Sequence, residues 1–456
     1  MPDGPPKEIY IVDIRLASMK TSTLWAIVAV IIIAILGGAL VYQYLTAVPT
    51  GEEAPILEVV HYWTSGSEQA AIEEVFSVFK EEYPEVSIVS APIAGGGGTT
   101  MVAVLTTKML AGEAPDAFQT QPGYRIQPYA DADLIQSLNT MYDEMGWSDV
   151  LPEEFLEWGK YEGEYLMVPV NLHRRNVFFY NTQIFEDAGI TEEPTTWEEL
   201  WDACDAIEGI GVTPLSVGLR DKPWPAQHFS IIAYSHSIEF TQDLYNGEIT
   251  DPNDSDLRTV LGTLAKLYSY IDTSSFGRTW DESSAAVYTG NAAMQFMGDW
   301  AKGEFDVVAN WTYGVEYDSF PAPGTAEYVI PSIDSFAMPQ GSLHPTQAER
   351  FLEILLTEEV QIEFNKLKGS TPIVIGTSAA EFDEYHQEIM QGLEDETLML
   401  LPGGRHTMMP PVIQTEFQDI LHDFAVDLDI DKAADALMDS VTTNEDAFTI
   451  TWQITP

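Results

Sequence analysis

Strands and helices alternate along residues 56–120, and this pattern constrains the fold more than any other feature. Three runs rich in apolar and β-branched residues, "ILEVVHYW", "EVSIVSAPI" and "DAFQT", predict strands. Between them, "SEQAAIEEVFSVFKEEYP" and "TTMVAVLTTKMLAGEAP" predict helices, with Pro84 ending the first and Gly112 and Pro115 ending the second. Strands that alternate with helices indicate an α/β fold with a mostly parallel sheet and helices on both faces. Ligands of such sheets bind beyond the carboxyl ends of the strands.

Acidic residues dominate the chain after residue 50. The 456 residues hold 72 acids and 20 bases, a net charge of −52, and residues 1–50 contribute three of each. A body this acidic excludes a surface that binds nucleic acid or an anionic membrane. It suits a halophilic or marine setting, where salt screens the self-repulsion; an ordinary soluble acidic protein is the alternative. The length and the apolar fraction of 45% predict two domains.

An uncharged apolar run, "LWAIVAVIIIAILGGALVYQYL", occupies residues 24–45. A helix that spans a bilayer needs about 20 such residues, so the run predicts a transmembrane anchor. Arg15 and Lys20 precede the run, which places the N-terminus in the cytoplasm and everything after residue 46 outside. A cleaved signal peptide is the alternative, but the length of the run and its "VYQYL" end favour an anchor.

The single cysteine, Cys204, excludes an intrachain disulfide and a cysteine-based metal site. In "TTWEELWDACDAI", Thr196 and Glu199 form a capping-box pattern, and Cys204 falls on the apolar face of the helix that follows, so we expect it in the core. Ser-centred elbows, HExxH motifs and Cys/His groupings are absent from the sequence. We therefore expect no catalysis, no cofactor and no metal. An anchored glycosidase, which needs only a carboxylate pair, is the alternative.

Four consecutive glycines lie in "PIAGGGGTTM", residues 92–101, just before the second predicted helix. A Walker loop would end in Gly-Lys-Ser/Thr, and a dinucleotide fingerprint would place its glycines in the first turn with an acid on the next strand. Neither pattern is present. Two interpretations remain: a turn that lets the backbone approach a polar group closely, and a plain flexible loop.

Further along, the chain resembles a known family. The stretch "GEYLMVPVNLHRRNVFFYNTQIFEDAGITEEPTTWEELWDAC", followed in order by "GNAAMQFMGDWAKGEF", "PAPGT", "IDSFAMPQG" and "FNKLKGSTP", is similar to the extracellular solute-binding proteins of sugar-specific ABC importers. The resemblance covers roughly residues 57–440. It is greatest to bacterial glucose-binding proteins, which share "YWT…E", "AGGGGTT", "PVN.HR.NV..Y", "MGDWA" and "LKGS".

The resemblance implies a periplasmic-binding-protein-like α/β fold of two lobes joined by a hinge of crossing strands, preceded here by the transmembrane helix. The implied segments are a cytoplasmic stretch 1–23, the anchor 24–45, a linker 46–56, lobe 1 at 57–172 plus 333–368, and lobe 2 at 173–332 plus 369–456. We expect a monomer whose partners are a glucose-like sugar and the permease subunits of an ABC transporter. A receptor that reports sugar to a sensor is the alternative, and another hexose or a disaccharide remains an open ligand.

The implied sugar site combines aromatic rings, for the apolar faces of a pyranose, with donors and acceptors for its hydroxyls. Trp63, at the end of the first strand, and Trp224, in the Pro-rich polar loop "DKPWPAQHF", are implied as stacking platforms; a core role is the alternative for Trp63. Asp299, after an apolar run in "MGDW", is implied to bind hydroxyls, and capping of the next helix is the alternative. Glu68 is implied as an acceptor for two hydroxyls, or else it is an ordinary first-turn acid.

Other parts of the same site come from the glycine turn and from the crossings. Gly96 and Gly97 are implied on the rim of the sugar site, where the backbone approaches the ligand. Gln121 stands where the resembling glucose-binding proteins carry a histidine, which leaves the identity of the sugar open. Arg174 is expected to pair with a carboxylate. Further candidates share a polar or aromatic group suited to a sugar: Tyr62, Asn171, His173, Trp280, Lys368 and His406.

Overall fold

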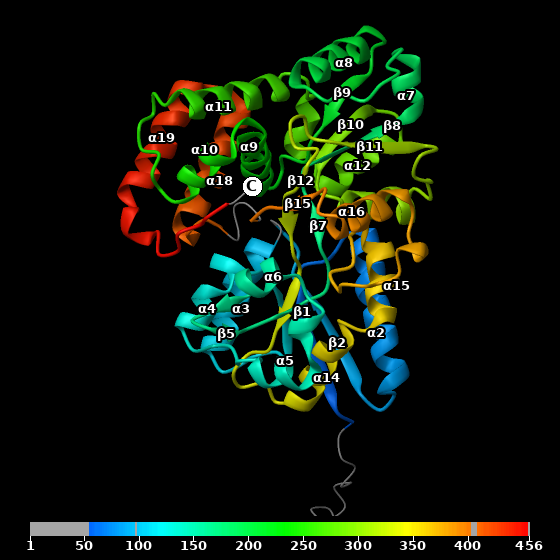
Figure 1. Cartoon of the computed structure of the whole chain (residues 1–456), viewed down its shortest axis with the longest axis vertical. Helices are drawn as coiled ribbons and strands as arrows, with labels where there is room; N and C mark the ends of the chain where they lie inside the picture. Colours follow the sequence, from blue (N-terminus) through cyan, green and yellow to red (C-terminus); the bar gives the residue numbers. More distant parts are fainter. Residues whose placement is uncertain (1–53, 96–97, 403–407, 455–456) are drawn as a thin grey trace, which may run out of the picture. The chain divides into compact units, whose positions relative to one another are not determined.

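Two β-sheets, each packed with helices, organise the chain beyond residue 54 (Figure 1). In this computed structural model the described residues are 54–95, 98–402 and 408–454. The predicted transmembrane run at 24–45 lies outside them. Among the described residues, no helix combines the length and the apolar character that a membrane span requires.

The first lobe is built on a five-stranded mixed sheet. Its elements are β1 (Ile56–His61), α2 (Gly66–Glu82), β2 (Ser87–Pro92), α3 (Thr99–Leu110), β3 (Ala117–Thr120), η2 (Gly123–Arg125), α4 (Gln127–Asp131), α5 (Asn139–Met145), η3 (Trp147–Asp149), α6 (Glu153–Trp158), β4 (Lys160–Tyr161), β5 (Glu164–Tyr165), β6 (Val168–Pro169), β14 (Ser335–Ala337), α14 (Pro345–Ile354) and α15 (Glu358–Lys368). The strand order is β2-β1-β3-β14-β6, and β1 pairs in parallel with β2 and β3, as the alternation predicts. β14 is antiparallel to β3 and β6 because it returns from the second lobe.

The second lobe is built on a four-stranded sheet of order β11-β8-β10-β9. Its elements are β8 (Val177–Asn181), α7 (Thr182–Asp187), α8 (Trp197–Gly209), β9 (Thr213–Ser216), α9 (Pro223–His236), α10 (Ile238–Tyr245), α11 (Ser255–Tyr268), η4 (Thr273–Gly277), α12 (Trp280–Tyr288), β10 (Ala292–Met297), α13 (Trp300–Gly303), the π-helix η5 (Glu304–Val308), β11 (Tyr317–Pro321), β12 (Tyr328–Val329), η6 (Ala379–Glu381), α16 (Glu384–Glu394), β15 (Met399–Leu400), α18 (Pro411–Asp427), α19 (Ile430–Thr443) and η7 (Glu445–Ala447). β8 is antiparallel to β10 and β11, and only β9 and β10 are parallel. The prediction of a mostly parallel sheet, made from the first lobe, is wrong for this one.

The chain passes between the lobes along three segments that lie side by side. β7 (His173–Arg174) pairs antiparallel with β13 (Pro331–Ser332), so the first and second crossings form one short ladder. Leu172 exchanges two backbone hydrogen bonds with Thr371, at 2.8 and 2.9 Å, which adds the third crossing, after α15. The crossing strands that the resemblance implies are therefore present, and their side chains reach both lobes.

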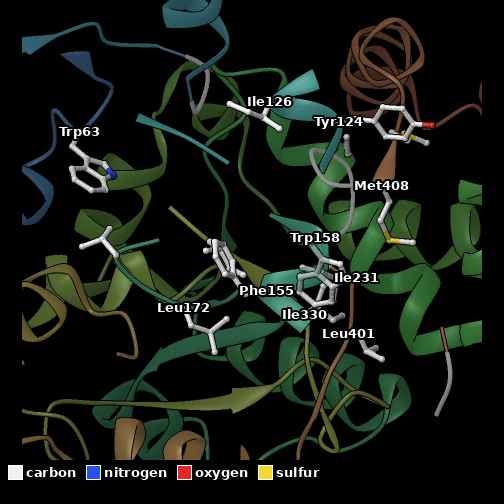
Figure 2. Close-up of a cluster of buried hydrophobic side chains, with 14 of the residues drawn as sticks. Trp63, Tyr124, Ile126, Phe155, Trp158, Leu172, Ile231, Ile330, Leu401 and Met408 are labelled. Atoms are coloured by element: carbon white, nitrogen blue, oxygen red, sulfur yellow. The ribbon is translucent and has the colours of Figure 1, made fainter. Parts of the chain in front are cut away.

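Local sequence signals account for several elements and for the core. Capping boxes begin α2 and α8, the second formed by Thr196 and Glu199 as predicted. Cys204, on the inner face of α8, is 1% exposed, which confirms its place in the core. Figure 2 shows part of the largest buried cluster, to which Trp63 and Leu172 both belong.

Close glycine packing joins the start of α2, in the first lobe, to α13 and η5, in the second. A Cβ added to Gly303 would lie 2.7 Å from the carbonyl oxygen of Leu367 and 2.9 Å from Cβ of Ser67. Glu304 accepts hydrogen bonds from the backbone N–H of Ser67 at 3.0 Å and from its hydroxyl at 2.7 Å. Because the first N–H groups of a helix have no partner within the helix, the carboxylate of one lobe caps a helix of the other.

Candidate functional site

A cavity of about 370 Å³, the interlobe cavity, lies between the two lobes beside the crossing segments. Small-molecule sites occupy roughly 300–1,000 Å³, so this volume suits a compact ligand. Its wall includes Tyr62, Trp63, Glu68, Gln121 and Lys368 from the first lobe, and His173, Arg175, Trp224, Gln227, Trp280, Trp300 and Asp334 from the second lobe and the crossings. Of the predicted site residues that the structure describes, all line this cavity except Asn171 and Asp299.

Glu68 and Lys368 form an ion pair in the wall of the first lobe. Nζ of Lys368, the last residue of α15, lies 3.2 Å from Oε1 of Glu68. Oε2 of Glu68 accepts the backbone N–H of Thr64 at 3.3 Å, and its own N–H donates to Ser65, so Glu68 is also the capping-box acid of α2. The interpretation of Glu68 as a first-turn acid is confirmed, and its role as an acceptor for sugar hydroxyls stays a prediction. Because each charge has its partner, the pair can present oriented donors and acceptors without a net charge.

Trp63 and Gln121 complete the first-lobe wall. β1 ends at His61, so Trp63 follows the strand rather than ending it. Its ring is 1% exposed, lies 5.2 Å from Phe364 between centroids, and has the Lys368 ammonium 5.7 Å from its centroid. Trp63 thus belongs to the core and also borders the cavity. Nε2 of Gln121 donates to the hydroxyl of Ser332 at 3.0 Å, whereas its Oε1 has no hydrogen-bond partner among the described residues.

Three tryptophans form the aromatic side of the second lobe. Trp224 lies in the first turn of α9 and not in a loop, which corrects the prediction; Pro223 begins this helix, where proline needs no N–H partner. The rings of Trp224 and Trp300 are 5.9 Å apart between centroids, with an interplanar angle of 38°. Trp280 begins α12 and is half-buried. Three indole rings therefore border the cavity from the second lobe, whereas the Glu68–Lys368 pair belongs to the first-lobe wall.

A buried network of polar side chains lies at the crossings. Nδ1 of His173 is hydrogen-bonded to Asp299, and Nε2 lies 3.4 Å from Oδ2 of Asp334. Asn171 binds Asp334 twice: its Oδ1 accepts the backbone N–H at 2.9 Å, and its Nδ2 donates to Oδ2 at 3.2 Å. The hydroxyl of Tyr62 donates to Oδ1 of Asp334 at 2.8 Å. The network thus fixes two cavity residues, Tyr62 and His173, through groups that are distant in the sequence.

Opposing effects set the protonation of this network. Burial and the charge of Lys368 lower the pKa of His173, but the charges and hydrogen bonds of Asp299 and Asp334 outweigh them and raise it above its ordinary value. Burial raises the pKa of Asp334, yet the His173 hydrogen bond and the Lys368 charge hold it well below its ordinary value. Burial and the Asp334 charge raise the pKa of Tyr62, so its hydroxyl keeps its proton and remains a donor.

Asp299 lies behind His173 and does not line the cavity. The residue has no exposed surface, and its Oδ2 accepts the backbone N–H of Arg174 at 2.8 Å and the hydroxyl of Tyr385 at 3.2 Å. The predicted direct contact with a sugar is thus replaced here by protein donors. The alternative, a helix cap, is wrong too, because no side-chain capping bond precedes α13. In this arrangement Asp299 orients His173.

The described part of the glycine turn packs closely against the cavity wall. Gly95 lines the cavity. Gly98 has a φ of +86°, and a Cβ there would lie 2.7 Å from both Cδ1 of Tyr62 and Nη2 of Arg125. Only glycine fits such a position without strain, so close approach explains this residue better than a plain loop does. Three predicted site residues, Gly96, Gly97 and His406, lie outside the described residues.

Sequence reasoning missed several cavity residues and misjudged one neighbour. Asp334 is an acid inside the apolar stretch "PSIDSF", a pattern that would have flagged a buried carboxylate. Arg175 follows Arg174 on an extended segment, where successive side chains face opposite ways, so only one of the two arginines faces the cavity. The prediction for Arg174 is wrong: its Nη2 donates to the carbonyl of Tyr328 at 3.4 Å, and no carboxylate of the described residues lies within ion-pair distance.

Comparison with known proteins agrees with this architecture. The family described as bacterial extracellular solute-binding protein matches residues 63–362. An ABC transporter extracellular-binding protein of Pyrococcus horikoshii is 32% identical over 420 residues, which cover 91% of this chain and 93% of the relative. A probable sugar-binding periplasmic protein of Brucella melitensis is 33% identical over 344 residues, which cover 74% of this chain and 80% of the relative.

A solved structure shows the same fold. The bacterial solute receptor AcbH, whose substrate preference is for β-D-galactopyranose, matches with a TM-score of 0.74 at 18% identity, covering 87% of this chain and 100% of AcbH. Two lobes, three crossings and a cavity between them define the class of two-lobed solute receptors. The chain belongs to the bacterial extracellular solute-binding protein family. This is a family of binding proteins and not of enzymes, in line with the expectation from the sequence.

Proposed function

We propose that this protein binds a glucose-like monosaccharide in the interlobe cavity, outside the cell, and delivers it to the permease of an ABC importer. The observation that carries the proposal is the pairing of indole rings with compensated charges around one small cavity. A pyranose has apolar C–H faces and a rim of hydroxyls. The indole rings match the apolar faces, and the compensated charges match the hydroxyls. The sugar-binding name of the Brucella relative supports the same ligand class.

Unused polar atoms in the wall also favour a polyhydroxyl ligand. Oε1 of Gln121 is an acceptor and Nε1 of Trp300 is a donor, and neither has a partner within the described part of the chain. Buried polar groups are ordinarily hydrogen-bonded, so a ligand that both donates and accepts would satisfy them. A hydroxyl does both. The volume of about 370 Å³ favours a monosaccharide over a disaccharide.

Thermal unfolding against a sugar panel tests the proposal. A sugar present at 100 times its Kd stabilises the protein by about 2.7 kcal/mol. For a unit of about 400 residues the unfolding entropy is about 0.8 kcal/mol per kelvin, so Tm should rise by about 3 °C. The panel should contain aldohexoses, pentoses, disaccharides and amino acids. A rise with amino acids alone, or with no member of the panel, would contradict sugar binding.

A pair of tryptophan variants links binding to the cavity. Trp280→Ala removes a half-buried indole from the cavity wall and should weaken sugar affinity, because the sugar loses part of its apolar contact. Trp201 lies on α8, outside the cavity wall, and its half-buried indole stacks on Trp197 and Tyr270. Trp201→Ala should therefore leave sugar affinity unchanged. Equal effects of the two changes would place the sugar elsewhere.

The anchor and the glycosidase alternative need separate experiments. The proposal includes attachment to the cytoplasmic membrane by residues 24–45, which rests on the sequence. The full chain should fractionate with membranes, and deletion of residues 1–45 should release it without loss of sugar affinity.

Incubation with oligosaccharides should yield no new reducing ends; their appearance would favour the glycosidase. Stimulation of the permease ATPase by sugar-loaded protein would separate delivery from sensing.

A further inference from the structure

Arg175 is a buried cation in the wall of the interlobe cavity. It follows β7 in the first crossing, is 3% exposed, and belongs to the cavity lining. Nε donates to Oε1 of Gln227 at 3.3 Å, and Nη2 donates to the hydroxyl of Ser230 at 3.4 Å. Both acceptors are on α9, so this helix fixes the plane of the guanidinium. Nη1 makes no hydrogen bond within the described part of the chain.

Arg175 differs in its pairing from the other cations of the wall. Lys368 has Glu68 at 3.2 Å, and the exposed Arg220 has Glu282 at 3.8 Å. His173 lies between Asp299 and Asp334. Arg175 has no carboxylate within ion-pair distance among the residues that the structure describes, and both of its hydrogen bonds go to neutral oxygens.

A buried guanidinium in this situation has unused hydrogen-bonding capacity. Burial lowers the pKa of Arg175 to about 10, which leaves the group charged at neutral pH. The guanidinium has five N–H donors, and the hydrogen bonds to Gln227 and Ser230 occupy only part of them. Charge-assisted hydrogen bonds are about twice as strong as neutral ones, so an oxygen placed against the remaining donors gains more there than at a neutral group.

The surroundings favour a neutral oxygen over a carboxylate. The wall contains five acids, Glu68, Asp221, Asp281, Glu282 and Asp334, and the whole chain has a net charge of −52. The negative electrostatic potential of these acids would repel an anionic ligand, whereas it would not repel a neutral polyol. We propose that Arg175 is a ligand-binding residue that donates through its free N–H groups to hydroxyls of the sugar and thereby selects among sugars. This inference rests on the proposed sugar binding.

The adjacent residue provides a matched control. Arg174 is 4% exposed, one position earlier on the same segment, and does not line the cavity. Its guanidinium donates to the carbonyl of Tyr328. Arg174→Gln and Arg175→Gln therefore make the same chemical change at two equally buried positions, of which only one faces the ligand. Arg175→Lys keeps the charge but loses the planar fork, and serves if the glutamine variant fails to fold.

The experiment measures affinity for the best-binding neutral sugar and for its monodeoxy analogues by calorimetry. Arg175→Gln should weaken affinity roughly tenfold to hundredfold, Arg175→Lys by less, and Arg174→Gln by less than about threefold. One deoxy analogue should bind the wild type more weakly than the parent sugar yet bind Arg175→Gln as well as the parent does. That coupling shows that Arg175 and the missing hydroxyl meet.

Two results would overturn the inference while leaving sugar binding intact. The first is unchanged affinity in both Arg175 variants, with every deoxy analogue losing the same factor in variant and wild type. The second is tighter binding of the corresponding uronate than of the neutral sugar, which would make Arg175 a carboxylate site. If the wild type binds no sugar at all, the proposed function itself fails.

Discussion

Replacing Asp299 by asparagine separates a structural role from direct ligand contact. The carboxylate is fully buried and meets three donors: the backbone N–H of Arg174, the hydroxyl of Tyr385 and Nδ1 of His173. Asparagine has one acceptor oxygen and an NH₂ group that only donates. Whichever way the amide turns, the NH₂ group faces a donor of the native structure, and His173 loses the charge that supports its protonated form.

The cost follows from these contacts. A hydrogen bond to a charged group contributes about 1.5–3 kcal/mol, and breaking a buried ion pair by removing one partner costs about 3–5 kcal/mol. Because asparagine retains one acceptor and His173 can give up its proton, we expect a loss of about 2–4 kcal/mol. With about 0.8 kcal/mol per kelvin for a unit of this size, ligand-free Tm should fall by about 2–5 °C.

Calorimetric unfolding of the ligand-free protein at pH 6 and pH 9, followed by sugar titration, is the assay. The deficit should be largest at pH 6, below the raised pKa of His173, and should shrink as the pH rises through that pKa. Asp281→Asn is the control: Asp281 lines the cavity, is half-buried, and lies in the first turn of α12, so its loss should cost only about 0.3–1 kcal/mol. Unchanged ligand-free Tm for Asp299→Asn, together with much weaker sugar binding, would refute the reasoning and restore Asp299 as a direct sugar ligand.

Four further predictions concern stability and metal dependence. The raised pKa of His173 contributes stability below its unfolded value of 6.5, and this is lost as pH rises through the folded value; Tm should therefore fall on the alkaline side, and His173→Gln should flatten the profile. Gly303→Ala should lower Tm because its Cβ would meet Leu367 and Ser67, whereas Gly262→Ala, with no atom within 4 Å of the added Cβ, should not. Tm should rise between dilute buffer and molar potassium chloride, since salt screens the net charge of −52; an unchanged value would remove the halophilic interpretation. Sugar binding should survive chelation, and loss restored by calcium would reveal a metal site.

Local features were predictable from the sequence because their causes are local. The parallel pairing of β1 with β2 and β3 follows from strands that alternate with helices, and the capping box at Thr196 follows from a four-residue pattern. Periodicity alone was enough to place Cys204 in the core. The antiparallel sheet of the second lobe was not predictable in this way, because its order depends on strands that pair across more than a hundred residues.

The candidate site also has a part that the sequence predicted and a part that only the tertiary structure decided. Residue types suited to a sugar, such as Trp280 and Lys368, were recognisable from the resemblance, and both line the cavity. Whether a polar side chain faces the cavity or another side chain was decided only by tertiary structure. Asp299 is 126 residues from His173, and their contact satisfies a carboxylate that the sequence left available for a ligand. Arg175 is the opposite case. The crossing brings it to α9, which offers only neutral acceptors and leaves some of the N–H donors of Arg175 unused. The sequence determines which groups need partners, but the meeting of distant segments determines which partners the protein itself supplies and which are left for the ligand.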